Sequence, residues 1–452
     1  MNLTNALRFS STPRVGMVGG GGKTTAMFTL AREQSAPAIV AATAHMAIEQ
    51  TAPADQHFFV NTPADLAVCE HQPPTGITFF TGPSSDVGKT LGLTPENMLA
   101  VYALAERYHA PLFIEADGSK CLPLKAPAEH EPPIPDFVDT VIVVVGLSGL
   151  GQPLDVEHVH RPERYARLSG LSIGDIITPE AIAKVLCDPI GGLKNVPSTA
   201  RRIVLLNQAD TPELQAQAQV IARQLLPAYQ SVVIAALKYK NIFAVHEPVA
   251  GIILAAGGST RMGHAARKPL LMWRGEPFIR HVARTALAAG LSPVVVVAGA
   301  HADEVHAAVA DLPVVLVYNA DWEAGQSTSL KAGLQRLPVA IGSAVFMLAD
   351  QPQIPIELVR GLIEQHAQSL ASIIAPQIDG RRGNPVLFDR STFDDLRSLS
   401  GDVGGRAVFA RYPVTYLPWH DASILLDVDT PEDYQRLLDS AQAGNHGQEN
   451  YF

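Results

Sequence analysis

The sequence predicts an α/β fold divided into two domains, and three observations lead to this prediction. The chain has 452 residues, more than the roughly 100–200 residues of one usual domain. Short apolar runs alternate with helical patterns, which is the order of elements in parallel sheets. The alternation starts again after the proline at position 248. We therefore expect domains at 1–247 and 248–440, followed by a disordered tail at 441–452.

The apolar runs predict the strands, and the periodic segments between them predict helices. In the N-terminal half, buried strands are expected at residues 15–18, 37–41, 112–115, 140–145 and 203–206. In the C-terminal half they are expected at residues 250–254, 293–297, 313–317, 343–348 and 372–374. Helices are expected at residues 24–33, 212–226 and 277–289.

Composition argues against several classes of protein. Hydrophobic residues make up 47% and charged residues 17%, which is typical of packed domains rather than a disordered chain. The net charge of -10 provides no general attraction to nucleic acid or to an anionic membrane. The three cysteines (Cys69, Cys121 and Cys187) are too few and too widely spaced for a disulfide framework or a zinc site. With no apolar signal core and no spanning segment, we expect a cytoplasmic protein.

The first motif of the C-terminal half is a glycine-rich turn that directly follows the strand at 250–254. Glycines allow backbone N–H groups to approach a triphosphate closely, and Arg261 and Lys268 can neutralise charge that develops on it. A glycine turn alone would be ordinary surface structure, but this order of residues after a buried strand favours a nucleotide site. The residues expected to bind the nucleotide are Leu254, Ala255, Ala256, Gly257, Gly258, Ser259, Arg261 and Lys268.

Two acidic positions follow later apolar runs. Asp350 lies just beyond the strand at 343–348, where ligands bind in open α/β sheets, and a carboxylate there is a natural Mg²⁺ ligand. Its alternative role is to cap a helix. Asp427 and Asp429 can supply a second metal ligand, or they can precede a helix that Thr430 caps. Because alternate strand residues point to the same face, at most one of the two is expected to point into the site.

Two further segments are candidates for contacts with the base or the acceptor. Residues 319–330, which include Ser327, can form a loop and helix start beside the nucleotide. Arg381 and Arg382 can bind an acceptor phosphate, with Asn384 close by in the sequence. Taken alone, such segments are more often solvent-facing loops.

Together these segments resemble the MobA-like nucleotidyltransferases, and within them the MocA-like molybdenum cofactor cytidylyltransferases. The resemblance covers about residues 249–438 and rests on LAAGGSTRMG, KPLL, ADQP, RGNPVLF, GDVGGR and DVDTPED. It implies a Rossmann-like nucleotidyltransferase fold and transfer of CMP from CTP to the terminal phosphate of molybdopterin. It also implies that Lys268, Arg261 and Asp350 act in catalysis, with Mg²⁺ on Asp350 and Asp429. Asn384 stands where many members have histidine.

The N-terminal half contains a second candidate nucleotide site. A buried strand leads into Gly19, Gly20, Gly21, Gly22, Lys23, Thr24 and Thr25, which predicts a P-loop-like parallel sheet. The backbone amides would bind phosphates, Lys23 would reach the β and γ groups, and Thr24 would hold Mg²⁺. Glu115 and Asp117 end another strand as candidate partners of that metal. Asn207 and Asp210 either read a base or form an ordinary turn.

The segments GGGGKTT, EADGSK, PLKAPAEHEP and NQAD are similar to the YqeC-type family over about residues 14–237. That resemblance implies an accessory protein for selenium-dependent molybdenum hydroxylases, with a hydroxylase of the xanthine dehydrogenase type as partner. Lys120, Lys125 and His130 are candidates for a basic acceptor pocket. For His130, and for His158 and His160, the favoured interpretation is an ordinary polar loop.

The leading interpretation is a two-domain enzyme of molybdenum cofactor maturation. Its C-terminal half would use CTP, Mg²⁺ and molybdopterin, and its N-terminal half would use ATP or GTP. A first alternative keeps the transferase reaction but makes the acceptor a sugar or alditol phosphate. A second alternative is a carrier or chaperone that binds finished cofactor without catalysis.

Overall fold

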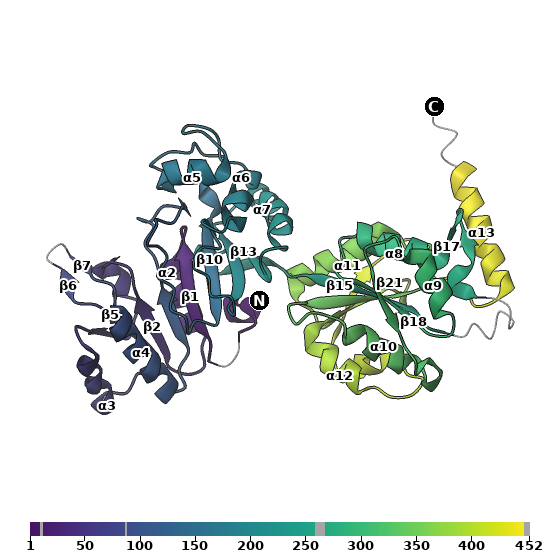
Figure 1. Ribbon diagram of the computed structural model, residues 1–452, viewed down its shortest axis with the longest axis horizontal. Coiled ribbons are helices and arrows are strands. Elements are labelled where there is room, and N and C mark those ends of the chain that lie inside the picture. The colour runs from purple at the N-terminus through teal and green to yellow at the C-terminus, as the bar shows by residue number, and fades with distance from the viewer. Residues whose placement is uncertain (10–11, 86–87, 258–266, 447–452) are drawn as a thin grey trace. The chain divides into compact units, whose positions relative to one another are not determined.

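The computed structural model describes residues 1–9, 12–85, 88–257 and 267–446 of the chain. It divides into two compact units, Met1–His246 and Glu247–Phe452, which we call the N-terminal and C-terminal units (Figure 1). Each unit is an α/β structure with one large sheet, so the predicted fold class is confirmed.

The N-terminal unit is built on a nine-stranded sheet with the order β14-β13-β12-β10-β1-β8-β2-β5-β4. Neighbouring strands are parallel, except that β14 runs antiparallel to β13 at one edge. Every residue of β2, β8 and β10 is buried, as expected for parallel strands covered on both faces. The strands are β1 (Arg14–Gly19), β2 (Ala38–Ala42), β4 (Gln56–Phe59), β5 (Ile77–Thr81), β8 (Leu112–Glu115), β10 (Thr140–Gly146), β12 (Arg201–Asn207), β13 (Ser231–Ala236) and β14 (Asn241–His246).

Short strands and helices complete the N-terminal unit. A parallel pair joins β9 (Leu124–Lys125) to β11 (Val159–His160), and β3 (Met46–Ala47), β6 (Ser84–Ser85) and β7 (Lys89–Thr90) form a small sheet. The helices are α1 (Leu3–Leu7), α2 (Lys23–Arg32), α3 (Val68–His71), α4 (Pro95–Arg107), α5 (Pro162–Ser169), α6 (Pro179–Cys187) and α7 (Pro212–Leu225).

Local sequence explains where several of these helices begin. The side chains of Thr94, Thr178 and Thr211 each accept an N–H from the first turn of α4, α6 and α7, and a proline follows each threonine. Helix α2 differs, because it begins after Gly22 with no side-chain cap. Its first N–H groups therefore stay available to a ligand.

The sheet of the C-terminal unit has the order β19-β18-β15-β20-β23-β21-β22, and β24 pairs with β21. Strands β15, β18, β19 and β20 are parallel, whereas β23 runs antiparallel to both of its neighbours. The strands are β15 (Val249–Ala255), β18 (Val294–Ala298), β19 (Val315–Tyr318), β20 (Ser343–Leu348), β21 (Ile373–Ile378), β22 (Arg381–Arg382), β23 (Val386–Asp389) and β24 (Val414–Pro418), with a hairpin of β16 (Met272–Trp273) and β17 (Glu276–Pro277).

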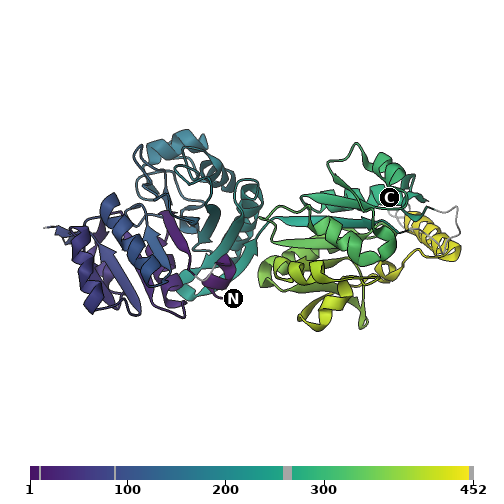
Figure 2. The same cartoon turned by 60° about the horizontal axis from the view of Figure 1, so that its bottom comes forward.

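Helices cover both faces of this sheet, as Figures 1 and 2 show from two directions. One core cluster packs α8, α9 and α11 on one face, and a second packs α10 and α12 on the other. A smaller cluster of Trp273, Phe278, Val428 and Leu437 attaches α13. The helices are α8 (Phe278–Ala288), α9 (Ala302–Val309), α10 (Gln326–Leu334), α11 (Ile356–Ser369), α12 (Phe393–Ser398) and α13 (Pro431–His446).

Helix α13 corrects one expectation about the end of the chain. It continues to His446, so residues 441–446 are helical rather than disordered. Alanine and glutamine follow residue 440 without an intervening proline, and both residue types favour a helix. None of the helices in the described parts of the chain is long and apolar enough to cross a membrane.

The core of the C-terminal unit gives a stability prediction. Leu362 of α11 is fully buried, whereas Val339 is 99% exposed. We expect Leu362→Ala to lower the free energy of unfolding by about 2–5 kcal/mol, because it removes buried contacts and leaves a cavity. All three tryptophans (Trp273, Trp322 and Trp419) belong to this unit, so their fluorescence during urea unfolding reports on it alone. Val339→Ala is the control and should change little.

Candidate nucleotide sites of the two units

The C-terminal unit has a cavity of about 630 Å³ where β15 and β20 end, at the carboxyl edge of the parallel strands. Six of the residues that were expected to bind the nucleotide line this cavity: Leu254, Ala255, Ala256, Gly257, Lys268 and Asp350. The expected residues Gly258, Ser259 and Arg261 lie outside the described residues. The cavity therefore brings together residues that are nearly 100 positions apart in the sequence.

Lys268 joins the two carboxylates that the sequence predicted as metal ligands. Its Nζ donates a hydrogen bond to Asp429 Oδ1 and lies 3.9 Å from Asp350 Oδ2. Lys268 begins a short 3-10 helix, Lys268–Leu270, whose Pro269 is buried and whose Leu270 packs against the core. This packing holds the ammonium group at the mouth of the cavity.

Asp350 has an environment that suits a bound cation. Burial raises the pKa of Asp350 to about 6; Lys268 lowers it, and the charges of Asp427 and Asp429 raise it. Its Oδ1 is buried and has no hydrogen-bond partner among the residues that the structure describes. A buried carboxylate oxygen without a partner is costly unless a ligand satisfies it.

The Asp-x-Asp segment differs from the expectation in its backbone, and neither Asp427 nor Asp429 lines the cavity. Residues 426–429 form a loop rather than a strand, so alternation does not separate the two aspartates. Both carboxylates lie close enough to Asp350 to raise its pKa. Gln351 Nε2 donates to Asp427 Oδ1 at 2.6 Å, a contact that the sequence did not predict. Thr430 caps α13 as expected, because its Oγ1 accepts from Asp433 N at 3.2 Å.

The residues present fit a magnesium ion completed by substrate. Among the described residues, no group of three or more His, Cys, Asp and Glu side chains is placed to hold a metal ion. Mg²⁺ commonly uses only one or two carboxylates and takes its other oxygens from phosphates and water. Asp350, with its unpartnered oxygen, and Asp429 are the two carboxylates that would hold it.

Part of the segment at 319–330 lines the cavity, although Ser327 does not. Trp322, Glu323 and Gln326 line it, together with Asp402, which the sequence did not identify. Ser327 is buried, and its Oγ donates to Gly401 O at 2.7 Å. It therefore ties α10 to the loop that presents Asp402. This loop approaches so closely that a Cβ on Gly325 would lie 2.5 Å from Asp402 N.

The predicted acceptor residues lie elsewhere on the unit. Arg381, Arg382 and Asn384 do not line this cavity. Arg382 is on the short strand β22, where its guanidinium stacks 4.3 Å from the ring centroid of Phe409, and Arg381 is exposed. The hairpin pairing of β22 with β21 decides these positions, and pairing of that kind was not visible in the motif.

The N-terminal unit has a cavity of about 760 Å³ at the end of β1, where the chain turns into α2. Gly19, Gly21 and Gly22 have φ angles of 98°, 79° and 116°, a region that side-chain-bearing residues rarely adopt. Close packing adds a second restriction, because a Cβ on Gly21 would lie 2.2 Å from Gly146 N. Gly21, Gly22 and the next three residues line this cavity, whereas Gly19 and Gly20 do not.

Lys23 and Thr24 connect this glycine loop to the acids at the end of β8. Lys23 Nζ donates to Gly19 O at 2.7 Å and lies 3.4 Å from Asp117 and 3.8 Å from Glu115. Thr24 Oγ1 donates to Glu115 Oε2 at 2.9 Å. Burial raises the pKa of Glu115, and Lys23 opposes this shift. Thr24 and Glu115 are therefore placed to hold a cation beside phosphates on the loop.

Asn207 contacts the glycine loop, whereas Asp210 lies outside the lining of the cavity. Asn207 Nδ2 donates to Gly21 O at 2.8 Å, and Asn207 Oδ1 accepts from Leu237 N at 3.0 Å. Asn207 is thus a buried brace of the glycine loop. Asp210 is exposed and does not line the cavity. These two contacts join Asn207 to backbone groups that are distant in the sequence and that only the fold brings to it.

The candidate basic pocket is only partly as predicted. Lys120 and His130 line the cavity, but Lys125 is buried and pairs with Asp117 at 2.6 Å and with Glu131 at 2.8 Å. Although burial opposes the shift, hydrogen bonds from Arg161 and Lys125 lower the pKa of Glu131 to about 2. His160, for which an ordinary polar loop was expected, also lines the cavity, because β11 pairs with β9 beside it.

Comparison with known protein families assigns one family to each unit. Residues 251–416 match the MobA-like NTP transferase domain, and residues 15–163 match the YqeC protein family. These ranges contain the cavity-lining segments 254–257 and 21–25.

Three relatives cover most of their own length in the match. The uncharacterised protein YqeC of Escherichia coli (strain K12) is 36% identical over 200 residues, which are 43% of this chain and 75% of that protein. Nicotine blue oxidoreductase of Paenarthrobacter nicotinovorans is 33% identical over 199 residues, 42% of this chain and 96% of that protein. Purine catabolism protein PucB of Bacillus subtilis (strain 168) is 30% identical over 198 residues, 41% and 94% of the respective chains.

The raised pKa of Asp350 predicts how cation binding depends on pH. Asp350 must lose its proton to bind a cation, and its pKa is raised to about 6. We expect Mn²⁺ affinity, measured by electron paramagnetic resonance, to be constant above about pH 7 and about tenfold weaker at about pH 5. Asp350→Asn should remove this dependence, whereas Asp303→Asn, at an exposed position of the same unit, should retain it. An unchanged pH profile in Asp350→Asn would contradict the assignment.

The glycine loop gives a second prediction for the N-terminal unit. Gly22→Ala should weaken nucleotide binding by at least about tenfold, because its φ of 116° and a Cβ 2.5 Å from Asn207 Nδ2 force the loop to move. Gly16→Ala is the matched control, since its Cβ would make ordinary contacts of 3.4 Å or more. Binding of a fluorescent ATP or GTP analogue measures the effect, and equal affinities in the two variants would show that the loop is not the binding site.

Proposed function

The chain belongs to the MobA-like NTP transferase family through its C-terminal unit and to the YqeC family through its N-terminal unit, and on this premise we propose a specific reaction. The reaction is transfer of CMP from CTP to the terminal phosphate of molybdopterin, with release of pyrophosphate. The N-terminal unit would contribute a nucleotide-dependent accessory step that uses ATP or GTP.

One observation supports the transfer reaction most directly. Lys268 lies between Asp350 and Asp429 at the mouth of a cavity that begins where the β15 turn starts. A cation and carboxylates at the end of parallel strands are what a triphosphate and its metal require. Mg²⁺ held by Asp350 and Asp429 would neutralise charge on the phosphate that is attacked.

The protein's own groups then have limited chemistry to perform. The acceptor phosphate is already an anion, so no strong general base is needed. One of its oxygens forms a bond to the α-phosphorus of CTP, while the bond from that phosphorus to the bridging oxygen breaks and pyrophosphate leaves. Lys268 would stabilise the charge that moves onto the leaving group, and Ala256 and Gly257, which line the cavity after β15, would contact the triphosphate.

The support for molybdopterin as acceptor comes from the sequence. The ordered segments ADQP, RGNPVLF and GDVGGR resemble the MocA-like branch, and the turn has LAAG. A molybdenum hydroxylase of the xanthine dehydrogenase type is the partner that we propose.

Pyrophosphate release with molybdopterin, Mg²⁺ and CTP, GTP or ATP tests this function. We expect turnover with CTP, and a loss of at least about a hundredfold in Asp350→Ala, because the metal carboxylate is removed. Asp303→Ala should retain full activity. Absence of turnover with every nucleotide, in protein shown to be folded, would overturn the proposal.

A change of acceptor in this assay, a binding measurement and a redox assay distinguish three other functions. Turnover with a sugar or alditol phosphate in place of molybdopterin would change the acceptor but keep the reaction. Tight binding of finished cofactor without any turnover would indicate a carrier. The relative named nicotine blue oxidoreductase makes an oxidoreductase activity worth measuring in a separate assay.

A further inference from the structure

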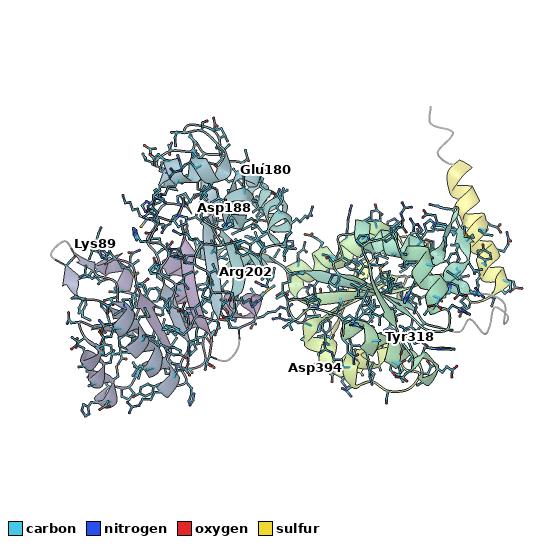
Figure 3. All side chains as sticks on the ribbon, viewed as in Figure 1. Lys89, Glu180, Asp188, Arg202, Tyr318 and Asp394 are labelled. Atoms are coloured by element: carbon cyan, nitrogen blue, oxygen red, sulfur yellow. The ribbon has the colours of Figure 1, made fainter. Side chains whose placement is uncertain are left out.

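The cavity of the N-terminal unit contains more cationic and imidazole groups than a nucleotide on the glycine loop uses. Its lining includes Lys89, Lys120, His130 and His160, which we call the basic set. Lys89, labelled in Figure 3, is on β7, Lys120 follows β8, His130 follows β9, and His160 is on β11. Four separate segments therefore converge on one cavity with the glycine loop.

Charge pairing leaves this set free to attract an anion. The acids of the cavity already have partners, since Glu115 and Asp117 pair with Lys23, and Glu131 pairs with Lys125 and Arg161. Lys89 and Lys120 form no ion pair with any residue in the described ranges. The cavity therefore keeps uncompensated positive charge beside the loop.

The backbone holds Lys120 at a fixed place relative to the loop. Lys120 and Cys121 have φ angles of 52° and 61°, which cost energy for residues with side chains. The next residue, Leu122, accepts a hydrogen bond from Gly21 N at 3.0 Å through its carbonyl oxygen. The strained turn is thus tied directly to the glycine loop, and such strain concentrates at binding sites.

His160 contributes a neutral polar group to the same region. Burial, and then the charges of Arg161, Lys125 and Lys120, lower the pKa of His160 to about 4. Near neutral pH it is uncharged and can donate one ring N–H to an anion. The charges that disfavour a proton on His160 favour a negative ligand beside it.

A second cavity beside the glycine loop offers space for the nucleoside part of a nucleotide. It measures about 950 Å³, includes Thr24 and Thr25 in its lining as the first cavity does, and is also lined by Phe28, Leu237 and Lys238. A nucleoside can lie on this side of Thr24 and Thr25, with its phosphates on the loop. The basic set then remains for another molecule.

We propose that the N-terminal unit binds two ligands at once: a nucleotide on the glycine loop and a phosphate-bearing small molecule whose anionic group lies among the basic set. This inference rests on the proposed nucleotide binding of the unit and adds the chemical class of its second substrate.

Inorganic phosphate is the probe that tests the second site. Calorimetry on the full chain, with Mg²⁺ and a saturating non-hydrolysable ATP or GTP analogue, should still detect phosphate binding. We expect Lys120→Ala to weaken that binding about tenfold, because a charge-assisted contact is lost, and to leave nucleotide affinity unchanged. Lys184→Ala, an exposed lysine of α6 outside the cavity, is the matched control and should bind phosphate like the original chain.

The outcomes separate this inference from the proposed function. If the nucleotide analogue abolishes the phosphate binding that depends on Lys120, or if Lys120→Ala and Lys184→Ala behave alike, the second site is wrong. Lys23→Ala should weaken the nucleotide analogue strongly. If it does not, the proposed nucleotide binding of this unit fails, and the two-ligand site fails with it.

Discussion

A lysine that lies beside two carboxylates at the carboxyl edge of parallel strands is the interaction on which both candidate sites depend. Lys23 lies beside Glu115 and Asp117 in the N-terminal unit, and Lys268 lies beside Asp350 and Asp429 in the C-terminal unit. Two acids could not be held so close together without a cation, because their mutual repulsion would protonate one of them or push them apart.

This arrangement also explains how a ligand would be accepted. Asp350 and Asp429 would hold a divalent cation, which would supply charge neutralisation for the phosphates, and Lys268 would contact the phosphates beside it. In the C-terminal site, the buried Oδ1 of Asp350 has no hydrogen-bond partner among the described residues.

The two units place a lysine beside two carboxylates with different structural elements. In the N-terminal unit, glycines with positive φ and a brace from Asn207 hold the loop, and the adjacent acids are balanced by further buried cations. In the C-terminal unit, an antiparallel strand enters the sheet at β23. Loops after it bring Asp402 into the lining of the cavity and place Asp427 and Asp429 near Asp350.

The sequence by itself indicated the α/β class and the central parallel strands of both sheets, because apolar runs and glycine-rich turns are local properties. It did not indicate β4, β5, β13, β14, β23 or β24. It singled out Lys23, Lys268 and Asp350, and these three residues line the two cavities. The tertiary structure alone decided that Asn207 braces a loop, that Lys125 is consumed by Asp117 and Glu131, and that Arg382 stacks on Phe409. Those contacts depend on which groups, distant in the sequence, meet after folding. The spacing of residues along the chain does not show which groups will meet.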